Sequence, residues 1–220
     1  MNIQEIISPY LAIVQPGKIR SIVTTQSSIA TIQKSVYNVL VASVITVLIS
    51  LFQNILIRTQ LEQEIAHATG AQKIIFQQQF TALQQATSVP FVLFAVLIVV
   101  VSFYISQAIL YGIVKLLGSK QSFQKQAYFI SMSNLVITTI SGGLVFLLFA
   151  LGLNANSLIG SVLFVVQIGV MAYTIYLLYH LIQVIHELSM VKTIVALLII
   201  TGLSIAILTI FSSGLTPVGG

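Results

Sequence analysis

The sequence predicts an all-α fold: a polytopic membrane helix bundle with five transmembrane helices, a cytoplasmic N-terminal amphipathic helix and an external helical hairpin. Three observations lead to this prediction. Hydrophobic residues make up 57% of the 220-residue chain and charged residues only 6%, where a soluble domain carries about a quarter. The charges stand between long apolar runs, and about 20 apolar residues suffice to cross the hydrocarbon core of a bilayer. These proportions exclude a soluble globular domain and a disordered chain.

The positions of the charged residues delimit the spans. Lys34 and Arg58 bracket the first uncharged run, and Pro90 suits the first turn of the second span. The uncharged stretch from Gln126 to His186 is about twice the length of one span, and the turn Gly152–Ser157 divides it. The five predicted spans are about 35–57, 89–114, 127–151, 157–185 and 190–211, within a transmembrane domain of residues 35–220.

The distribution of lysine and arginine predicts the orientation in a cell membrane. Of the nine such residues, seven fall on the side of the N-terminus and two, Arg58 and Lys73, on the other side. The seven are Lys18, Arg20, Lys34, Lys115, Lys120, Lys125 and Lys192. Because cytoplasmic loops are enriched in positive charge, we expect a cytoplasmic N-terminus and, with five spans, an external C-terminus.

Two segments outside the spans also have apolar residues at helical spacing. Within the N-terminal segment, residues 1–34, the stretch Ile19–Ile32 places apolar residues at helical spacing among polar ones and predicts a helix lying in the cytoplasmic interface. Between the first two spans, Arg58–Ser88 places Ile, Leu and Phe among many glutamines, with Gly70 in the middle. We expect two short amphipathic helices hinged at Gly70, forming an external hairpin; a disordered polar loop is the alternative.

Four features together resemble a known family. They are a proline in the N-terminal segment (Ser8-Pro9-Tyr10), a loop of some thirty residues after the first span, the compact basic turn Gly118–Phe123, and the connector His186–Thr193 before the last helix. In these features the chain resembles the Yip1 family of five-span integral membrane proteins, as a prokaryotic-type member. The resemblance implies five spans and a cytoplasmic N-terminus. The Asp-Leu-Tyr-Gly-Pro string of eukaryotic members is absent, so a role in vesicle budding is not implied.

Polar residues recur on the predicted spans at helical spacing. They form candidate interior stripes, because polar groups in hydrocarbon favour partners on neighbouring helices. Such stripes line a polar passage or join the helices by hydrogen bonds, and the pattern favours the second. The candidate stripe residues are Ser43, Ser50, Gln53, Asn134, Thr138, Tyr176, His180 and Gln183.

No constellation typical of catalysis or metal binding is evident. The chain has no cysteine, and His180 and His186 are six residues apart, so they do not share a helix face as a metal pair would. Glu187 adjoins His186 but points elsewhere on the helix. We expect no enzymatic activity, no cofactor and no metal. The net charge is +5. The positive residues are few and lie between apolar blocks, which argues against nucleic acid as a partner.

The expected partners are therefore the lipid bilayer and other membrane proteins or further copies of the chain. The basic turn with Lys115, Lys120 and Lys125 is a candidate contact for anionic lipid headgroups. We predict a non-enzymatic membrane organiser, or a scaffold or subunit that binds other membrane proteins. The alternative is a transport component, either a small permease or a subunit of a larger complex. A continuous polar cavity lined by His180, Asn134 and Ser50 would favour the alternative.

Overall fold

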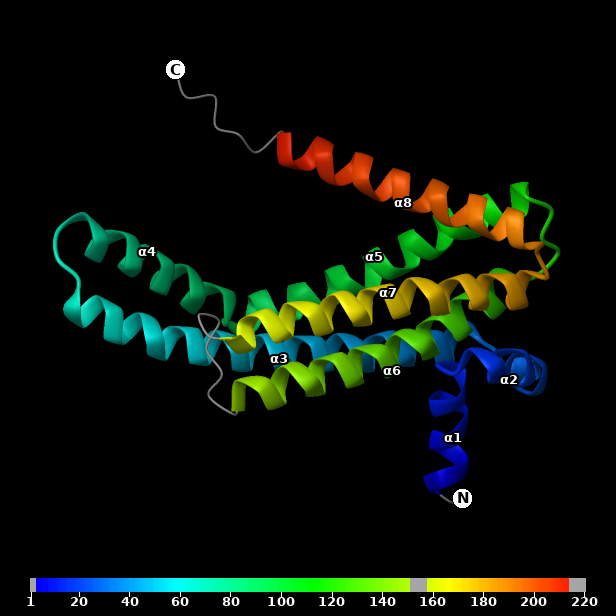
Figure 1. Cartoon of the computed structure of the whole chain (residues 1–220), viewed down its shortest axis with the longest axis horizontal. Helices are drawn as coiled ribbons and strands as arrows, with labels where there is room; N and C mark the ends of the chain where they lie inside the picture. The colour runs from blue at the N-terminus through cyan, green and yellow to red at the C-terminus, as the bar shows by residue number, and fades with distance from the viewer. Residues whose placement is uncertain (1–2, 151–157, 214–220) are drawn as a thin grey trace. The chain divides into compact units, whose positions relative to one another are not determined.

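The computed structural model describes the backbone of residues 3–150 and 158–213, and these residues are helical apart from short connections (Figure 1). The α-helices are α1 (Ile3–Ile13), α2 (Ile19–Gln26), α3 (Ile32–His67), α4 (Ala71–Ala86), α5 (Val89–Leu116), α6 (Phe123–Ala150), α7 (Leu158–His186) and α8 (Met190–Ser213). Two 3-10 turns, Pro16–Lys18 and Ser27–Ile29, flank α2. The all-α prediction is confirmed. The predicted turn Gly152–Ser157 lies outside the described residues.

Four helices in the described part of the chain are long and apolar enough to cross a membrane. Their spanning stretches are Ile32–His67, Val89–Leu116, Phe123–Phe146 and Val165–His186. The fifth predicted span corresponds to α8, in which the apolar stretch among the described side chains is Met190–Leu203. The chain is thus a helical membrane protein with four candidate spans, and the fifth span stays a prediction.

The helices divide into two compact units, each of which is described by itself. The first unit contains the described residues within 1–35, 104–130 and 174–220. The second unit contains the described residues within 36–103 and 131–173. The helices α3, α5, α6 and α7 each contribute one end to the first unit and the rest to the second.

In the first unit, α1 and α2 pack together at the N-terminus. Ile13, Ile19 and Val23 are buried, which accounts for the apolar spacing noted in the sequence. The helix that begins at Ile19 ends at Gln26, earlier than the predicted Ile32. Side-chain hydroxyls of Thr24 and Ser27 bond back to backbone carbonyls at the end of α2, and such bonds compete with regular helix. The location of α2 in the membrane interface stays a prediction.

The second unit contains the predicted hairpin around Gly70. Gly70 adopts a positive φ of 57°, which favours glycine, and α4 starts at the next residue. The helix before Gly70 is the end of α3, which continues through Arg58 to His67 instead of ending with the apolar run at Ile57. Within the unit, the Arg58 guanidinium lies 5.0 Å from the centre of the Phe80 ring and so joins the two arms of the hairpin.

Candidate functional site

Two helix ends in the first unit share the same backbone termination. At the end of α5, Ser119 N–H bonds to Val114 C=O at 3.0 Å and Gly118 N–H to Lys115 C=O at 3.0 Å, with Gly118 at φ 97°. These bonds form a Schellman motif, in which a left-handed residue satisfies the last helical carbonyls. At the end of α7, Leu188 N–H bonds to Gln183 C=O at 3.2 Å, and the left-handed position is held by Glu187 at φ 53°.

A buried hydrogen bond connects these two helix ends. Ser119 Oγ and His186 Nδ1 lie 2.7 Å apart, and only 5% of Ser119 and 2% of His186 are exposed. The Ser119 hydroxyl also accepts a bond from Gln121 N–H at 3.3 Å. The tautomer of His186 sets which of Oγ and Nδ1 donates in the bond between them. The other ring nitrogen, Nε2, is buried without a hydrogen-bond partner in the described structure.

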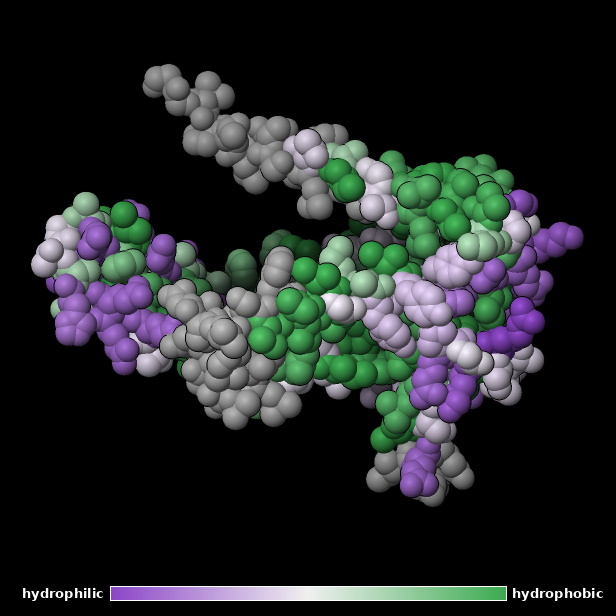
Figure 2. Space-filling model, viewed as in Figure 1, coloured by the Kyte–Doolittle hydropathy of each residue, from purple (hydrophilic) through white to green (hydrophobic). Residues whose placement is uncertain are grey.

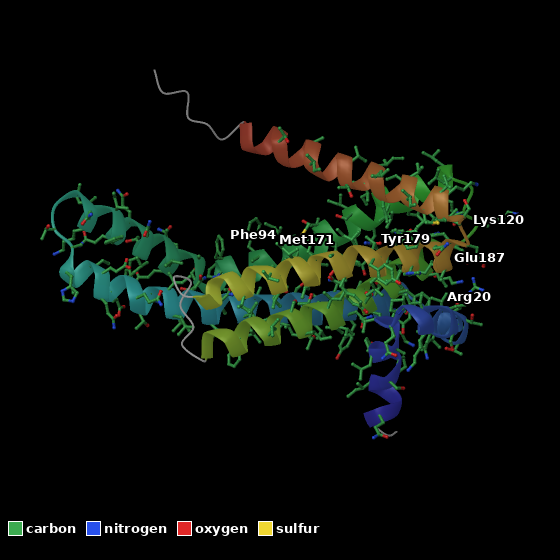
Figure 3. The ribbon with its side chains drawn as sticks, viewed as in Figure 1. Arg20, Phe94, Lys120, Met171, Tyr179 and Glu187 are labelled. Atoms are coloured by element: carbon green, nitrogen blue, oxygen red, sulfur yellow. The ribbon has the colours of Figure 1, made fainter. Side chains whose placement is uncertain are left out.

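Three further side-chain bonds surround this pair. Gln121 Nε2 donates to Glu187 Oε1 at 3.0 Å, and Lys125 Nζ donates to Gln121 Oε1 at 3.2 Å. Lys192 Nζ donates to Leu117 C=O at 2.8 Å, where its charge is favourable beside the C-terminal carbonyls of α5. We call Ser119, Gln121, Lys125, His186, Glu187 and Lys192 the polar cluster. It joins the α5–α6 turn to the α7–α8 turn, and Figure 3 shows Lys120 and Glu187 at this end of the first unit.

A second set of buried bonds in the first unit joins α3, α5 and α6. Gln126 Nε2 donates to both the backbone and the side-chain oxygen of Gln107 at 2.9 Å. Ser35 Oγ donates to Ala127 C=O at 3.0 Å, and the Tyr104 hydroxyl donates to Ser35 Oγ at 3.0 Å. Ser35, Gln107 and Gln126 are buried and Tyr104 is half-buried, and each bond offsets part of the cost of that burial. The end of the unit is therefore fixed by polar as well as apolar contacts.

The stripe residues of the first unit lie on α7. Tyr176 is exposed, while His180 and Gln183 are half-buried. The His180 ring meets the Tyr176 ring edge to face, with centroids 4.5 Å apart, and it meets Tyr179 at 5.1 Å. The structure thus brings together two of the three predicted residues, through an aromatic contact within one helix.

The stripe residues of the second unit lie on α3 and α6. Ser43 is buried, and its hydroxyl donates to Val39 C=O of the same helix at 2.7 Å. Ser50 is exposed, and Gln53, Asn134 and Thr138 are half-buried. No hydrogen bond between these five side chains occurs among the described contacts. The interior role assigned to the stripes stays a prediction.

The three lysines of the basic turn differ in their surroundings. Lys115 and Lys120 are exposed, and Lys125 is half-buried. The Lys115 ammonium lies 5.3 Å from the centre of the Tyr111 ring. Within the described part of the chain, no group of three or more metal-ligating side chains comes together.

Sequence reasoning missed the partner of His186. It compared His186 with His180 and Glu187, which are near it on one helix, whereas the structure pairs it with Ser119, 67 residues away. It also missed Gln107 and Gln126, whose buried amides bond to each other. One signal was present: a glycine directly after the last apolar residues of a span predicts a helix end at Gly118 and places Ser119 just beyond it.

Comparison with known proteins gives one family match, to a model described as the Yip1 domain, which covers residues 25–212. This range contains all four candidate spans and the whole polar cluster. Neither the curated proteins nor the solved structures that were compared include a match.

Proposed function

We propose that this chain, which belongs to the Yip1 domain family, is a non-enzymatic integral membrane protein that acts as a membrane organiser or as a scaffold or subunit binding other membrane proteins. The observation that carries the proposal is the exposure of α5. No residue of its most apolar stretch is buried in the described structure. Large side chains are exposed at Leu93, Phe94, Leu97 and Ile98, which share one side of the helix.

An apolar helix with no fully buried residue in its spanning stretch needs lipid or another protein to cover its exposed side. Phenylalanine is frequent in protein contacts because its ring buries a large area with little loss of rotamer freedom. The polar side chains support the same proposal, because in the first unit they bond to one another at the helix ends. Hydroxyls on the spanning helices, such as Ser43 and Thr139, bond to their own backbone. Both arrangements suit packing more than a path for solute.

Photo-crosslinking in native membranes tests the proposal. A photoreactive phenylalanine at Phe94, which is exposed, should give discrete protein adducts, and the same group at Val136, which is buried in the second unit, should not. Adducts with another protein or with a second copy of the chain support the proposal. Adducts with lipid alone from Phe94 contradict it. Solute uptake into vesicles that is lost in His180→Gln would favour the alternative, a transport component.

The proposed arrangement is five spans in the cell membrane, with a cytoplasmic N-terminus and an external C-terminus. In support, all seven lysines and arginines assigned to the cytoplasmic side belong to the first unit, whereas Arg58 and Lys73 belong to the second. The variants Lys120→Cys and Gly220→Cys should react with an impermeant thiol reagent from opposite sides of the membrane. The chain has no native cysteine to interfere. Labelling of both from one side would refute the fifth span.

A further inference from the structure

Four lysines lie in the polar cluster or beside it, and the cluster contains one carboxylate. Lys115, Lys120 and Lys125 lie in or beside the α5–α6 turn, and Lys192 is fixed to that turn through Leu117 C=O. The one carboxylate of the cluster, Glu187, accepts its bond from the neutral Gln121 amide. In the described structure none of the four lysines forms an ion pair. The local charge is therefore 4 − 1 = +3 at one end of the first unit.

Apolar side chains next to these lysines are among the most exposed in the structure. Leu116, directly after Lys115, is 91% exposed, and Met190 and Val191, directly before Lys192, are 61% and 70% exposed. Figure 2 shows hydrophilic residues at this end of the first unit beside a hydrophobic surface. The surface thus combines cations with apolar groups that water does not favour.

The Lys192 ammonium has its position set by the α5–α6 turn. One of its three N–H donors is used by Leu117 C=O, which leaves two for another acceptor. The turn that presents Leu117 C=O depends on Gly118, because its φ of 97° would strain any other residue. A donor held in place in this way binds an anion with less loss of conformational freedom.

We propose that this surface binds the phosphate of an anionic glycerophospholipid, with the four lysines around the phosphate and Leu116, Met190 and Val191 against the acyl chains. The proposal rests on the integral-membrane function proposed above and names one lipid partner for it. A lipid fits better than an acidic peptide because the exposed apolar groups adjoin the lysines on both turns. A phosphate with attached acyl chains satisfies both kinds of group at once.

Tryptophan fluorescence in vesicles of defined composition tests the proposal, since the chain has no native tryptophan. The variant Leu116→Trp places one at the proposed site, and Leu97→Trp places one at an exposed position of α5 in the second unit. The full-length protein is reconstituted in phosphatidylcholine with a minor fraction of phosphatidylglycerol, and either lipid is brominated to quench nearby tryptophan. Around Leu116→Trp, we expect phosphatidylglycerol to be enriched by about fivefold or more over its fraction in the vesicle, since one lysine near an anionic surface contributes about that factor. Around Leu97→Trp, we expect no enrichment.

Variants of single lysines separate binding from folding. Lys120→Gln changes an exposed side chain outside the hydrogen bonds of the polar cluster, and it should lower the enrichment by about fivefold. Lys73→Gln, a matched exposed lysine in the second unit, should leave it unchanged. Equal quenching by the two lipids at Leu116→Trp would overturn the proposal, and so would enrichment that Lys120→Gln leaves intact.

The source of the phosphate is settled in the same system. Inorganic phosphate, added at the ionic strength of a chloride control, should not displace the brominated lipid, because it lacks acyl chains. Displacement by phosphate beyond that by chloride would show a site for a free anion and overturn the lipid assignment, as would displacement by a glutamate-rich peptide. Crosslinking from Phe94 in the Lys120→Gln background should be unchanged. If the protein crosslinks from Phe94 were lost while the lipid enrichment remained, that result would count against the function proposed above.

Discussion

Replacement of Ser119 by alanine tests how strongly the polar cluster holds the two turns together. Ser119→Ala removes the only hydrogen-bond partner of His186 Nδ1 in the described structure, and His186 Nε2 already has none. A buried polar group left without a partner costs about 1–3 kcal/mol. The variant should lose that amount in free energy of unfolding, well above the average of about 0.6 kcal/mol for interhelical hydrogen bonds within membranes.

A double-mutant cycle isolates the contribution of the pair. Replacing both partners by apolar groups leaves no unpaired imidazole, so Ser119→Ala combined with His186→Leu should be more stable than the sum of the two single changes predicts. We expect a coupling of about 1–2 kcal/mol between two contacting residues. Reversible unfolding in mixed micelles, followed by far-ultraviolet circular dichroism, measures each variant. Ser102→Ala, at an exposed serine of α5, is the matched control.

Two results would refute this reasoning. A loss in Ser119→Ala no larger than that in Ser102→Ala would show that the bond contributes nothing to stability. Simple additivity of Ser119→Ala and His186→Leu would show that the two side chains act independently, in spite of their separation of 2.7 Å.

Two further predictions concern packing within each unit. A Cβ on Gly142 would overlap Ile49 Cδ1 and lie 3.3 Å from its Cγ1, so the free energy of unfolding of Gly142→Ala should be lower than that of Gly143→Ala by about 1 kcal/mol. Gly143→Ala, at a position with open space, should not lower it in the same unfolding measurement, and equal effects would contradict the proposed contact. His180→Gln loses an aromatic contact with Tyr176 that is worth about 0.5–1.5 kcal/mol, so it should still give a monodisperse protein and retain the cellular phenotype of the parent chain. A deletion-like phenotype with a well-folded protein would make α7 a functional helix.

The sequence predicted the helices better than their ends. The second predicted span, 89–114, corresponds closely to α5 (Val89–Leu116). Here the apolar run and the helix stop at nearly the same residue, because Gly118 follows and ends the helix. The first predicted span, 35–57, is only part of α3 (Ile32–His67). A charged residue such as Arg58 ends the stretch that suits hydrocarbon, but arginine, glutamine, glutamate and leucine are all good helix formers. Charge therefore locates the membrane boundary and not the end of the helix.

The α1 helix was not predicted for a related reason. It spans Ile3–Ile13 with Pro9 inside it, and proline in a helix interior usually argues against a helix. Tertiary contacts decide the outcome here, because Ile13 is fully buried in the first unit. Burial of this kind depends on residues distant in sequence, and periodicity within a short window does not reveal it.

The same limit explains which parts of the candidate site were predicted. Periodicity places polar residues on a face of one helix, as for Tyr176 and His180, whose rings are in contact. It does not say whether a polar side chain needs a partner from another helix. A serine or threonine hydroxyl can bond to the carbonyl four residues earlier, as Ser43 and Thr139 do, so its presence on a stripe says little about packing.

Amides and imidazoles do not have this local solution, and in this chain they carry the specific contacts between helices. Gln107 and Gln126 bond to each other across α5 and α6, Asn38 reaches the Ser131 hydroxyl across α3 and α6, and His186 binds Ser119 of the turn after α5. Each of these groups is buried, and leaving one unpaired would cost more than an average hydroxyl bond contributes. Buried amides and the imidazole thus contribute specific contacts to the alignment of the helices, together with the hydroxyls of Ser35 and Tyr104, whereas hydroxyls such as those of Ser43 and Thr139 bond to their own helix.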